Sequence, residues 1–286
     1  MSSLRRIAYT GVGLLGTVAT LTACAGDGQQ GIPTDTPEPP PTTSALPSTT
    51  TTAPVTSTAP VTSTEAPPAG PVVADVPGNP AAAAALRAFL TDLGTGGVPA
   101  VTDTCFTVPP SEIPVEYADV PAVFDAAAQP GSAEGDVVTW TGPVSTLSVA
   151  QDEVASGYAC PRVRPTGTDP VYTDIDAVYT VERYLGRFTG APVDPDDLEG
   201  DYPVVCDNTT PWDAQGTGIA TTPPLANNPG RLTGSASYNP DSVYVAYSNA
   251  GYTTVYADVT NVSGFEQNQV FTLTPDGNSF CIGDVA

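Results

Sequence analysis

The sequence predicts an α+β protein made of two small modules, each a helix followed by an antiparallel β-meander, after a disordered stalk. Three observations lead to this prediction: a Thr-, Ser- and Pro-rich segment near the N-terminus, two amphipathic helical patterns beyond it, and short β-branched segments after each helix. The chain divides into a signal peptide (1–23), a disordered stalk (24–78), a first module (79–166) and a second module (167–286).

The N-terminus has the features of an export signal. Arg5 and Arg6 supply a positive start, residues 7–20 form an uncharged and mostly apolar run, and small residues precede Cys24. The run is shorter than the roughly 20 apolar residues that a membrane-spanning helix needs. We therefore expect this segment to be cleaved rather than kept in the membrane.

The tetrad that ends the signal, Leu-Thr-Ala-Cys at Leu21–Cys24, resembles the lipobox of bacterial lipoproteins. The resemblance implies cleavage before Cys24 and a diacylglycerol on its thiol, with acyl chains such as palmitate. Two acyl chains anchor a protein stably, whereas one gives only marginal binding. The expected location is the extracytoplasmic face of the cell membrane. The alternative is an ordinary secretory signal with a cysteine there by chance.

All eight basic residues are arginines, and two of them lie in the signal. The remaining six stand against 31 acidic residues, so the mature chain carries a net charge of about −25. Such a charge repels phosphates, which excludes nucleic acid as a partner. An arginine-only basic set indicates a high-GC genome, and together with the lipobox it makes the chain similar to actinobacterial envelope lipoproteins.

The chain contains neither histidine nor lysine. A Ser-His-Asp or Cys-His apparatus and imidazole-ligated metal sites are therefore excluded. Schiff-base lysines and P-loops are excluded as well. Carboxylate or tyrosine chemistry and calcium held by oxygen ligands remain open.

Four cysteines remain once Cys24 is lipidated: Cys105, Cys160, Cys206 and Cys281. An even number in an oxidising exterior predicts two disulfides. Three pairings can be drawn, and we favour Cys105–Cys160 with Cys206–Cys281, because each module then has a helix, a cysteine, irregular chain and a meander that ends in the second cysteine. A zinc site is the rival, but no Cys-x-x-Cys spacing supports it.

In the first module the pattern predicts a helix that begins with Asn79 as N-cap and Pro80 as first residue and ends at Gly94. A shorter helix is expected at 120–128, capped by Asp119. The following apolar segments predict strands at 137–141, 145–150 and 154–164.

In the second module, Thr173 and Asp176 have the spacing of a capping box, and a helix follows that ends by Gly190. Its predicted apolar face contains Ile175, Val178, Val181, Leu185 and Phe188. Irregular chain is expected at 208–230. Strands are predicted at 242–247, 252–262, 267–274 and 279–282, with a hairpin turn at 275–278.

The closing hairpin, residues 269–282, resembles that of nuclear-transport-factor-two-like (cystatin-like cone) domains. The resemblance implies a cone with an apolar pocket and no fixed activity, because this fold hosts both enzymes and inert scaffolds. A single α+β domain with crossed disulfides is the alternative to two modules.

Two acidic features could carry chemistry. The loop 194–201 concentrates five carboxylates and could bind Ca²⁺, but Leu198 and Glu199 stand where an EF-hand loop needs an oxygen ligand and a glycine, so a solvated acidic loop is the preferred interpretation. A carboxylate pair for glycoside hydrolysis could come from Glu112, Glu116, Glu153 or Glu182. With 31 acidic residues, such pairs are expected by chance.

Aromatic residues in the second module could stack on the sugar rings of a glycan. These residues are Trp212, Tyr244, Tyr247, Tyr252 and Tyr256. In a strand-rich segment, core packing or shielding of a sheet is the preferred interpretation.

Taken together, these patterns predict a non-catalytic, lipid-anchored component of the cell envelope that binds or scaffolds, as a monomer and without cofactor or metal. Its expected partners are the membrane, through the anchor, and an envelope protein, lipid or glycan ligand. One alternative is a hydrolase that acts on cell-wall glycan or lipid through carboxylates. The other is a passive surface spacer.

Overall fold

The computed structural model describes residues 70–286. The predicted signal peptide, Cys24 and residues 24–69 of the predicted stalk lie outside the described residues. Val73 and Val76 are buried in an apolar core. The fold therefore begins several residues earlier than expected.

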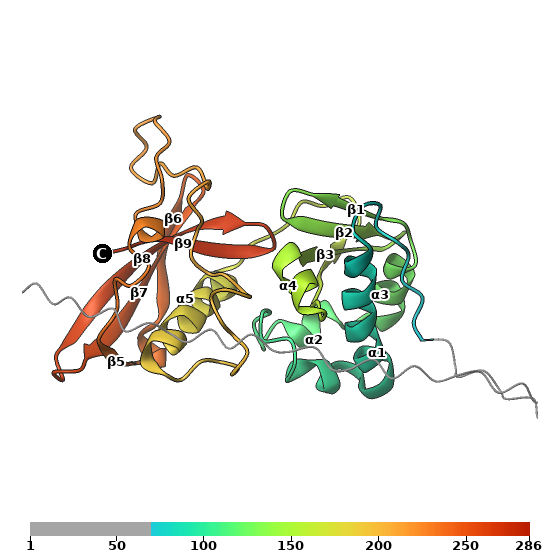
Figure 1. Cartoon of the computed structure of the whole chain (residues 1–286), viewed down its shortest axis with the longest axis horizontal. Helices are drawn as coiled ribbons and strands as arrows, with labels where there is room; N and C mark the ends of the chain where they lie inside the picture. The colour runs from blue at the N-terminus through green and yellow to red at the C-terminus, as the bar shows by residue number, and fades with distance from the viewer. Residues whose placement is uncertain (1–69) are drawn as a thin grey trace, which may run out of the picture. The chain divides into compact units, whose positions relative to one another are not determined.

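The architecture is α+β, as expected, with two antiparallel sheets (Figure 1). The first sheet has the strand order β1-β2-β3-β4. Helix α3 packs on β2 and β3, and α1 packs on α3 and α4. The elements of this first sheet region (residues 70–166) are α1 (Pro80–Thr102), α2 (Ile113–Glu116), α3 (Val120–Ala127), β1 (Gly131–Glu134), β2 (Val137–Thr141), β3 (Ser145–Ala150), α4 (Gln151–Ser156) and β4 (Arg162–Pro165).

Helix α1 continues past Gly94, so the predicted end is wrong. Gly94 stays helical, and a Cβ there would lie 3.2 Å from the ring of Phe124; this glycine serves a close approach of α3 rather than a stop. The helical path breaks instead at Gly97, where φ is 66° and ψ is −164°. Asn79 is the N-cap residue, but its side chain donates to Gln151 at 2.8 Å and does not cap the helix.

Helix α3 is capped as expected, because Oδ1 of Asp119 accepts from the backbone N–H of Ala122 at 3.1 Å. The strand expected at 154–164 is wrong. Helix α4 occupies its first residues and ends at Gly157 in the left-handed conformation, and only the last part is extended, as β4. So short an apolar pattern fits one turn of helix as well as a strand. The polar strand β1 carries no apolar alternation and was not predicted.

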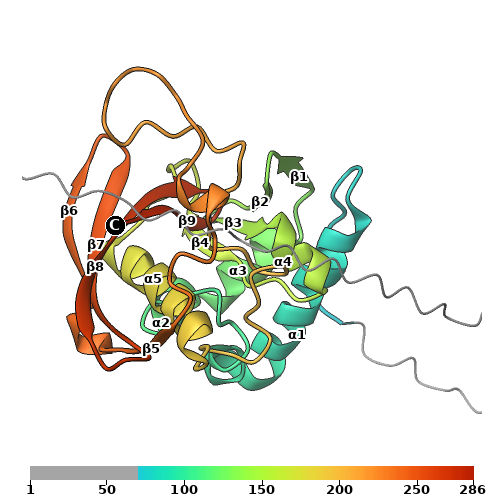
Figure 2. The same ribbon diagram turned by 60° about the vertical axis from the view of Figure 1, so that its left-hand side comes forward.

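The second sheet has the order β5-β7-β8-β9, and β6 pairs with β7. Register shifts interrupt three of its pairings, and such irregularities bend strands. The sheet curls around α5 (Figures 1 and 2). The elements of this second sheet region (residues 167–286) are α5 (Asp174–Thr189), η1 (Leu225–Asn227), β5 (Ser235–Tyr238), η2 (Pro240–Ser242), β6 (Tyr244–Asn249), β7 (Tyr252–Asn261), β8 (Glu266–Asp276) and β9 (Ser279–Val285).

Helix α5 begins at the predicted capping box. Oγ1 of Thr173 accepts from the N–H of Asp176 at 3.1 Å, and Oδ2 of Asp176 accepts from the N–H of Thr173 at 2.8 Å. Gly190 ends the helix in the left-handed conformation. Four predicted inward residues are buried or partly buried: Val178, Val181, Leu185 and Phe188. Ile175 is 48% exposed, contrary to prediction, because the first turn buries Asp176 instead.

The last hairpin is tighter than predicted. Asp276 already pairs with Ser279, so the turn consists of Gly277 and Asn278 alone. Gly277 has a φ of 54°, which glycine adopts without strain. Pro275 lies within β8 and pairs with Phe280.

Two disulfides are present, Cys105–Cys160 and Cys206–Cys281, with Cα–Cα distances of 5.6 and 4.8 Å. This is the pairing favoured from the sequence. The first lies within the core of the first sheet region, and the second lies in a small separate cluster with Trp212.

The two sheet regions pack together, and all described residues belong to one compact unit. Separate folding of the modules 79–166 and 167–286 therefore stays a prediction. Within residues 70–286, none of the helices combines the length and apolar character that a membrane-crossing segment requires.

Candidate functional site

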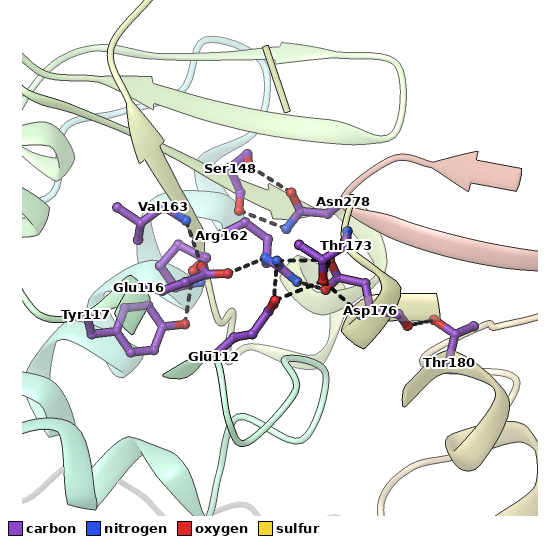
Figure 3. A network of polar contacts seen from close by, with 11 residues as sticks. Glu112, Glu116, Tyr117, Ser148, Arg162, Val163, Thr173, Asp176, Thr180 and Asn278 are labelled. Carbon is purple, nitrogen blue, oxygen red and sulfur yellow. Dashed lines mark hydrogen bonds and ion pairs between the residues drawn. The ribbon is translucent and has the colours of Figure 1, made fainter. Parts of the chain in front are cut away.

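A buried polar cluster is centred on Arg162, at the start of β4 (Figure 3). Its guanidinium contacts three carboxylates: Nε lies 2.6 Å from Glu116, Nη2 lies 2.9 Å from Glu112, and Nη1 lies 2.5 Å from Asp176. We call these four residues the Arg162 cluster. One cation here serves three anions.

Local structure explains why these side chains meet. Glu112 precedes α2 and Glu116 is its last residue, and residues four apart on a helix lie on one face. Asp176 is in the first turn of α5, where the helix dipole stabilises a carboxylate. The backbone N–H of Val163 also donates to Glu116 at 2.9 Å, which fixes β4 against α2.

The cluster joins the two sheet regions, since Asp176 comes from the second and the other members come from the first. Two further contacts do the same. Asn278 exchanges two hydrogen bonds with Ser148, at 2.7 and 2.9 Å (Figure 3), and the hydroxyl of Tyr179 donates to the carbonyl of Phe106 at 2.9 Å. Hydrogen bonds between side chains and backbone groups therefore link the two sheet regions at several points.

Burial dominates the electrostatics of the cluster. It raises the pKa of Glu116 to about 7, although Arg162 and the amide of Val163 lower it. Burial, followed by the charge of Asp176, also raises the pKa of Glu112. Because burial outweighs the attraction of Arg162, the carboxyls of Glu112 and Glu116 take up protons more readily than free carboxyls do.

Glu153, on α4, is a buried carboxylate outside the Arg162 cluster and is only 6% exposed. Its Oε2 accepts from the N–H of Cys160 at 2.8 Å. Burial raises its pKa to about 7, while the nearby Thr107 hydroxyl and the Cys160 amide lower it. It lines two cavities, of about 330 and 290 Å³. A perturbed carboxyl beside a cavity is a recognised candidate for a functional group.

The larger of these two cavities is negatively charged. It is also lined by the aspartates Asp136, Asp152, Asp207 and Asp276. Burial, followed by the charges of the other three, raises the pKa of Asp276. Arg162 and Arg183 line the same cavity, so its carboxylates outnumber its cations. Among residues 70–286, no group of three or more His, Cys, Asp and Glu side chains is arranged to hold a metal ion.

The loop 194–201 is not simply a solvated acidic loop, which corrects the preferred interpretation of the sequence. Asp197 is fully buried and lies 2.6 Å from Nη2 of Arg183. Arg187 pairs with Asp197 and with Glu199. The loop is thus held on α5 by two arginines that lie four residues apart on one face of the helix.

The aromatic residues divide into two groups. Trp212 is 1% exposed and packs edge-on against Tyr252 at 4.9 Å between ring centroids, so it serves the core. Tyr244 and Tyr247 on β6 are 54% and 60% exposed. Tyr256, on β7, is partly buried and packs against Tyr244 at 5.7 Å between ring centroids, so Tyr244 and Tyr247 are the most accessible of the five.

The structure brings Glu112 and Glu116 together and places Glu153 beside the cavities. Glu182 lines none of these cavities. Sequence reasoning did not single out Arg162, and it assigned Asp176 only to a helix cap and Asp197 only to an acidic loop. The small number of cations was the available indication. Only six arginines lie outside the signal peptide, so any carboxylate that is buried must pair with one of these few.

Comparison with protein-family models, curated proteins and solved structures finds no match for this chain, so fold and site stand on the geometry described above.

Proposed function

We propose that this protein is a lipid-anchored component of the cell envelope that binds or scaffolds, without catalysing a reaction. Cys24 carries the anchor, and the stalk separates the folded part from the membrane.

The observation that carries the proposal is the engagement of the paired carboxylates. Glu112 and Glu116 are the obvious acid–base pair, yet both bind the guanidinium of Arg162. A glycoside hydrolase needs one carboxyl to protonate a leaving group and the other to face a water or the sugar ring. Carboxylates that are paired with an arginine stabilise the fold and are not free to protonate a leaving group or to activate water.

The two disulfides point to an oxidising, extracytoplasmic location. An anchored protein in that compartment meets envelope proteins, lipids and glycans, which are the proposed partners. The excess of acidic residues disfavours anionic surfaces.

Labelling with a palmitate analogue and membrane fractionation test the anchor. We expect wild type in the membrane fraction with label attached, and Cys24→Ala released and unlabelled. Ala25→Gly, which keeps the thiol, should behave as wild type. Membrane attachment of Cys24→Ala with unchanged processing would overturn the anchor. Purification of wild type from native membranes should recover a lipid, glycan or envelope protein in stoichiometric amount, whereas the bare chain would favour the passive spacer.

One observation favours the hydrolase alternative: Glu153 is buried beside two cavities and has a pKa of about 7. An assay of cell-wall glycan hydrolysis by wild type, Glu153→Gln and Glu182→Gln decides between them. Under the binding proposal none of the three shows turnover. Turnover by wild type and Glu182→Gln that Glu153→Gln lacks would establish the hydrolase.

A further inference from the structure

The cavity of about 330 Å³ that Glu153 lines is formed by both sheet regions. Its four aspartates come from separate segments: Asp136 from the turn between β1 and β2, Asp152 from α4, Asp207 from the chain between α5 and β5, and Asp276 from the end of β8. The aspartates are exposed, whereas Glu153 is buried. The aspartates therefore form the mouth of the cavity, and Glu153 lies deeper.

Two arginines line the same cavity, but carboxylates outside it already pair with both. Arg162 is held by the other members of the Arg162 cluster, and Arg183 is held by Asp197. None of those carboxylates lines the cavity. Within residues 70–286, the five acidic side chains that do line it form no ion pair. The charge of the cavity walls is therefore complementary to a cation.

The carboxylate of Glu153 has one oxygen left for a ligand. Oε2 accepts from the N–H of Cys160, whereas Oε1 has no hydrogen-bond partner among residues 70–286 and is not among their sealed, unpaired polar atoms. The nearby hydroxyl of Thr107 is itself unpaired, so it does not occupy Oε1. Burial raises the pKa of Glu153 to about 7, and an ammonium group beside it would stabilise the charged form.

The apolar part of the walls indicates which kind of cation fits. Val108, Val205 and Phe280 line the cavity together with the carboxylates. Methylene groups gain from contact with such side chains, whereas a hydrated metal ion does not. The acidic side chains are also not gathered around one point as metal ligands are, among the residues that the structure describes. An organic cation with its charges spread along an alkyl chain matches both features.

We propose that this cavity binds a linear polyamine, a chain of methylene groups that carries two or more ammonium groups. One ammonium donates to Oε1 of Glu153, another lies among the aspartates at the mouth, and the methylene chain lies against Val205 and Phe280. A cavity of this size falls within the usual range for small-molecule sites. The polyamine is additional to the partners proposed above, and its binding does not depend on the lipid anchor.

Titration calorimetry with spermidine tests the proposal. The protein is the full chain carrying Cys24→Ala, which stays free of lipid, in about 0.15 M salt, where attraction to exposed charges is screened beyond about 8 Å. We expect spermidine to bind in a ratio of one to one. Butylamine, which has a single ammonium group, and Mg²⁺ should each bind at least about tenfold more weakly, because neither reaches Glu153 and the mouth together.

Two variant pairs locate the binding. Glu153→Gln should lower the affinity for spermidine about tenfold to a hundredfold, the worth of a hydrogen bond to a charged group, whereas Glu182→Gln should leave it unchanged. Asp152→Asn should lower the affinity about twofold to fivefold, since an exposed ion pair is weak. Asp125→Asn, on α3, makes the same change of charge away from the cavity and should have no effect. The second pair keeps the test decisive if Glu153→Gln does not fold.

Three results would overturn the proposal. The first is absence of spermidine binding. The second is an equal loss of affinity in each variant and its control, which would show only diffuse attraction to an acidic surface. The third is binding of Mg²⁺ or trilysine at least as tight as that of spermidine, which would assign the cavity to a counterion or to a basic protein segment. Because this protein is unanchored, each result is independent of the labelling test for Cys24.

Discussion

The two sheet regions bury their sheets in different ways. The first has a core cluster of 24 buried residues, to which its four helices, α1 to α4, and its sheet all contribute. The second has 16, because a single helix, α5, lies within the curve of its sheet. Strand β6 of the second sheet is left largely exposed. The smaller core must therefore be supplemented by other interactions.

The supplement is polar and covalent. In the second region, Arg183 and Arg187 hold the loop 194–201 on α5, and Cys206–Cys281 ties irregular chain to β9. In the first region the disulfide lies inside the core itself. Where loops rather than helices cover a helix, a cavity remains between them.

The largest expected effect comes from the disulfides. Replacing either pair by two alanines should lower the free energy of unfolding by about 4 kcal/mol, since each closes a loop of more than 50 residues. Hydrogen exchange should separate them. Loss of Cys206–Cys281 should speed exchange mainly in 207–230, while loss of Cys105–Cys160 should affect α1 and β4. Identical hydrogen-exchange patterns in the two variants would contradict the conclusion that the two disulfides stabilise different regions.

A smaller loss is expected from Arg162→Met, about 3 kcal/mol, because the buried Asp176 and the partly buried Glu112 and Glu116 lose their cation. Arg183→Met should cost less, since Asp197 keeps Arg187. Denaturant unfolding at neutral pH measures both. Arg164→Met, whose side chain meets a carbonyl and no carboxylate, is the control. Equal losses of stability in Arg162→Met and Arg183→Met would show that Arg187 does not compensate Asp197 for the loss of Arg183.

The pH dependence of the first region follows from Glu153. Its pKa in the folded protein is raised to about 7 from 4.5, so its contribution to stability is complete below pH 4.5 and is lost as the pH rises through 7. The free energy of unfolding should fall by about 2 kcal/mol between about pH 5 and 7 from this group. Glu153→Gln should flatten that part of the profile, and Glu182→Gln should flatten it less. An unchanged slope in Glu153→Gln would assign the dependence to the Arg162 cluster.

The smallest effect concerns helix caps in the first region. Asp119→Ala should cost about 1 kcal/mol, because its carboxylate caps α3. Asn79→Ala should cost about half as much, since its side chain bonds to Gln151 rather than to the end of α1. Thermal unfolding of both variants compares them. A larger loss for Asn79→Ala would mean that the hydrogen bond from Asn79 to Gln151 contributes more to stability than the helix cap made by Asp119.

Elements set by neighbouring residues could be predicted from the sequence. The capping box at Thr173 and Asp176, the cap at Asp119 and the left-handed Gly190 all depend on residues within a few positions of one another. Gly94 shows the limit. A glycine in a helical pattern signals either a stop or a close approach, and only the position of Phe124 distinguishes the two.

The candidate sites divide along the same line. Cys24 and the disulfide pairing rest on motif, count and spacing, which the sequence contains in full. The partners of Arg162 come from positions 112, 116 and 176, and no local pattern ties them together. The sequence does not reveal the burial of Asp197 either, because an acidic loop has the same sequence pattern whether its side chains are buried or in solvent.

The sequence by itself therefore determined the α+β class, the strong negative charge and the starts of several helices, because these follow from composition and short-range periodicity. Only the tertiary structure decided which carboxylates share Arg162 and which aspartate of the loop 194–201 is buried. The physical reason is that desolvation and ion pairing depend on which distant segments pack together, and this choice is made by the whole chain.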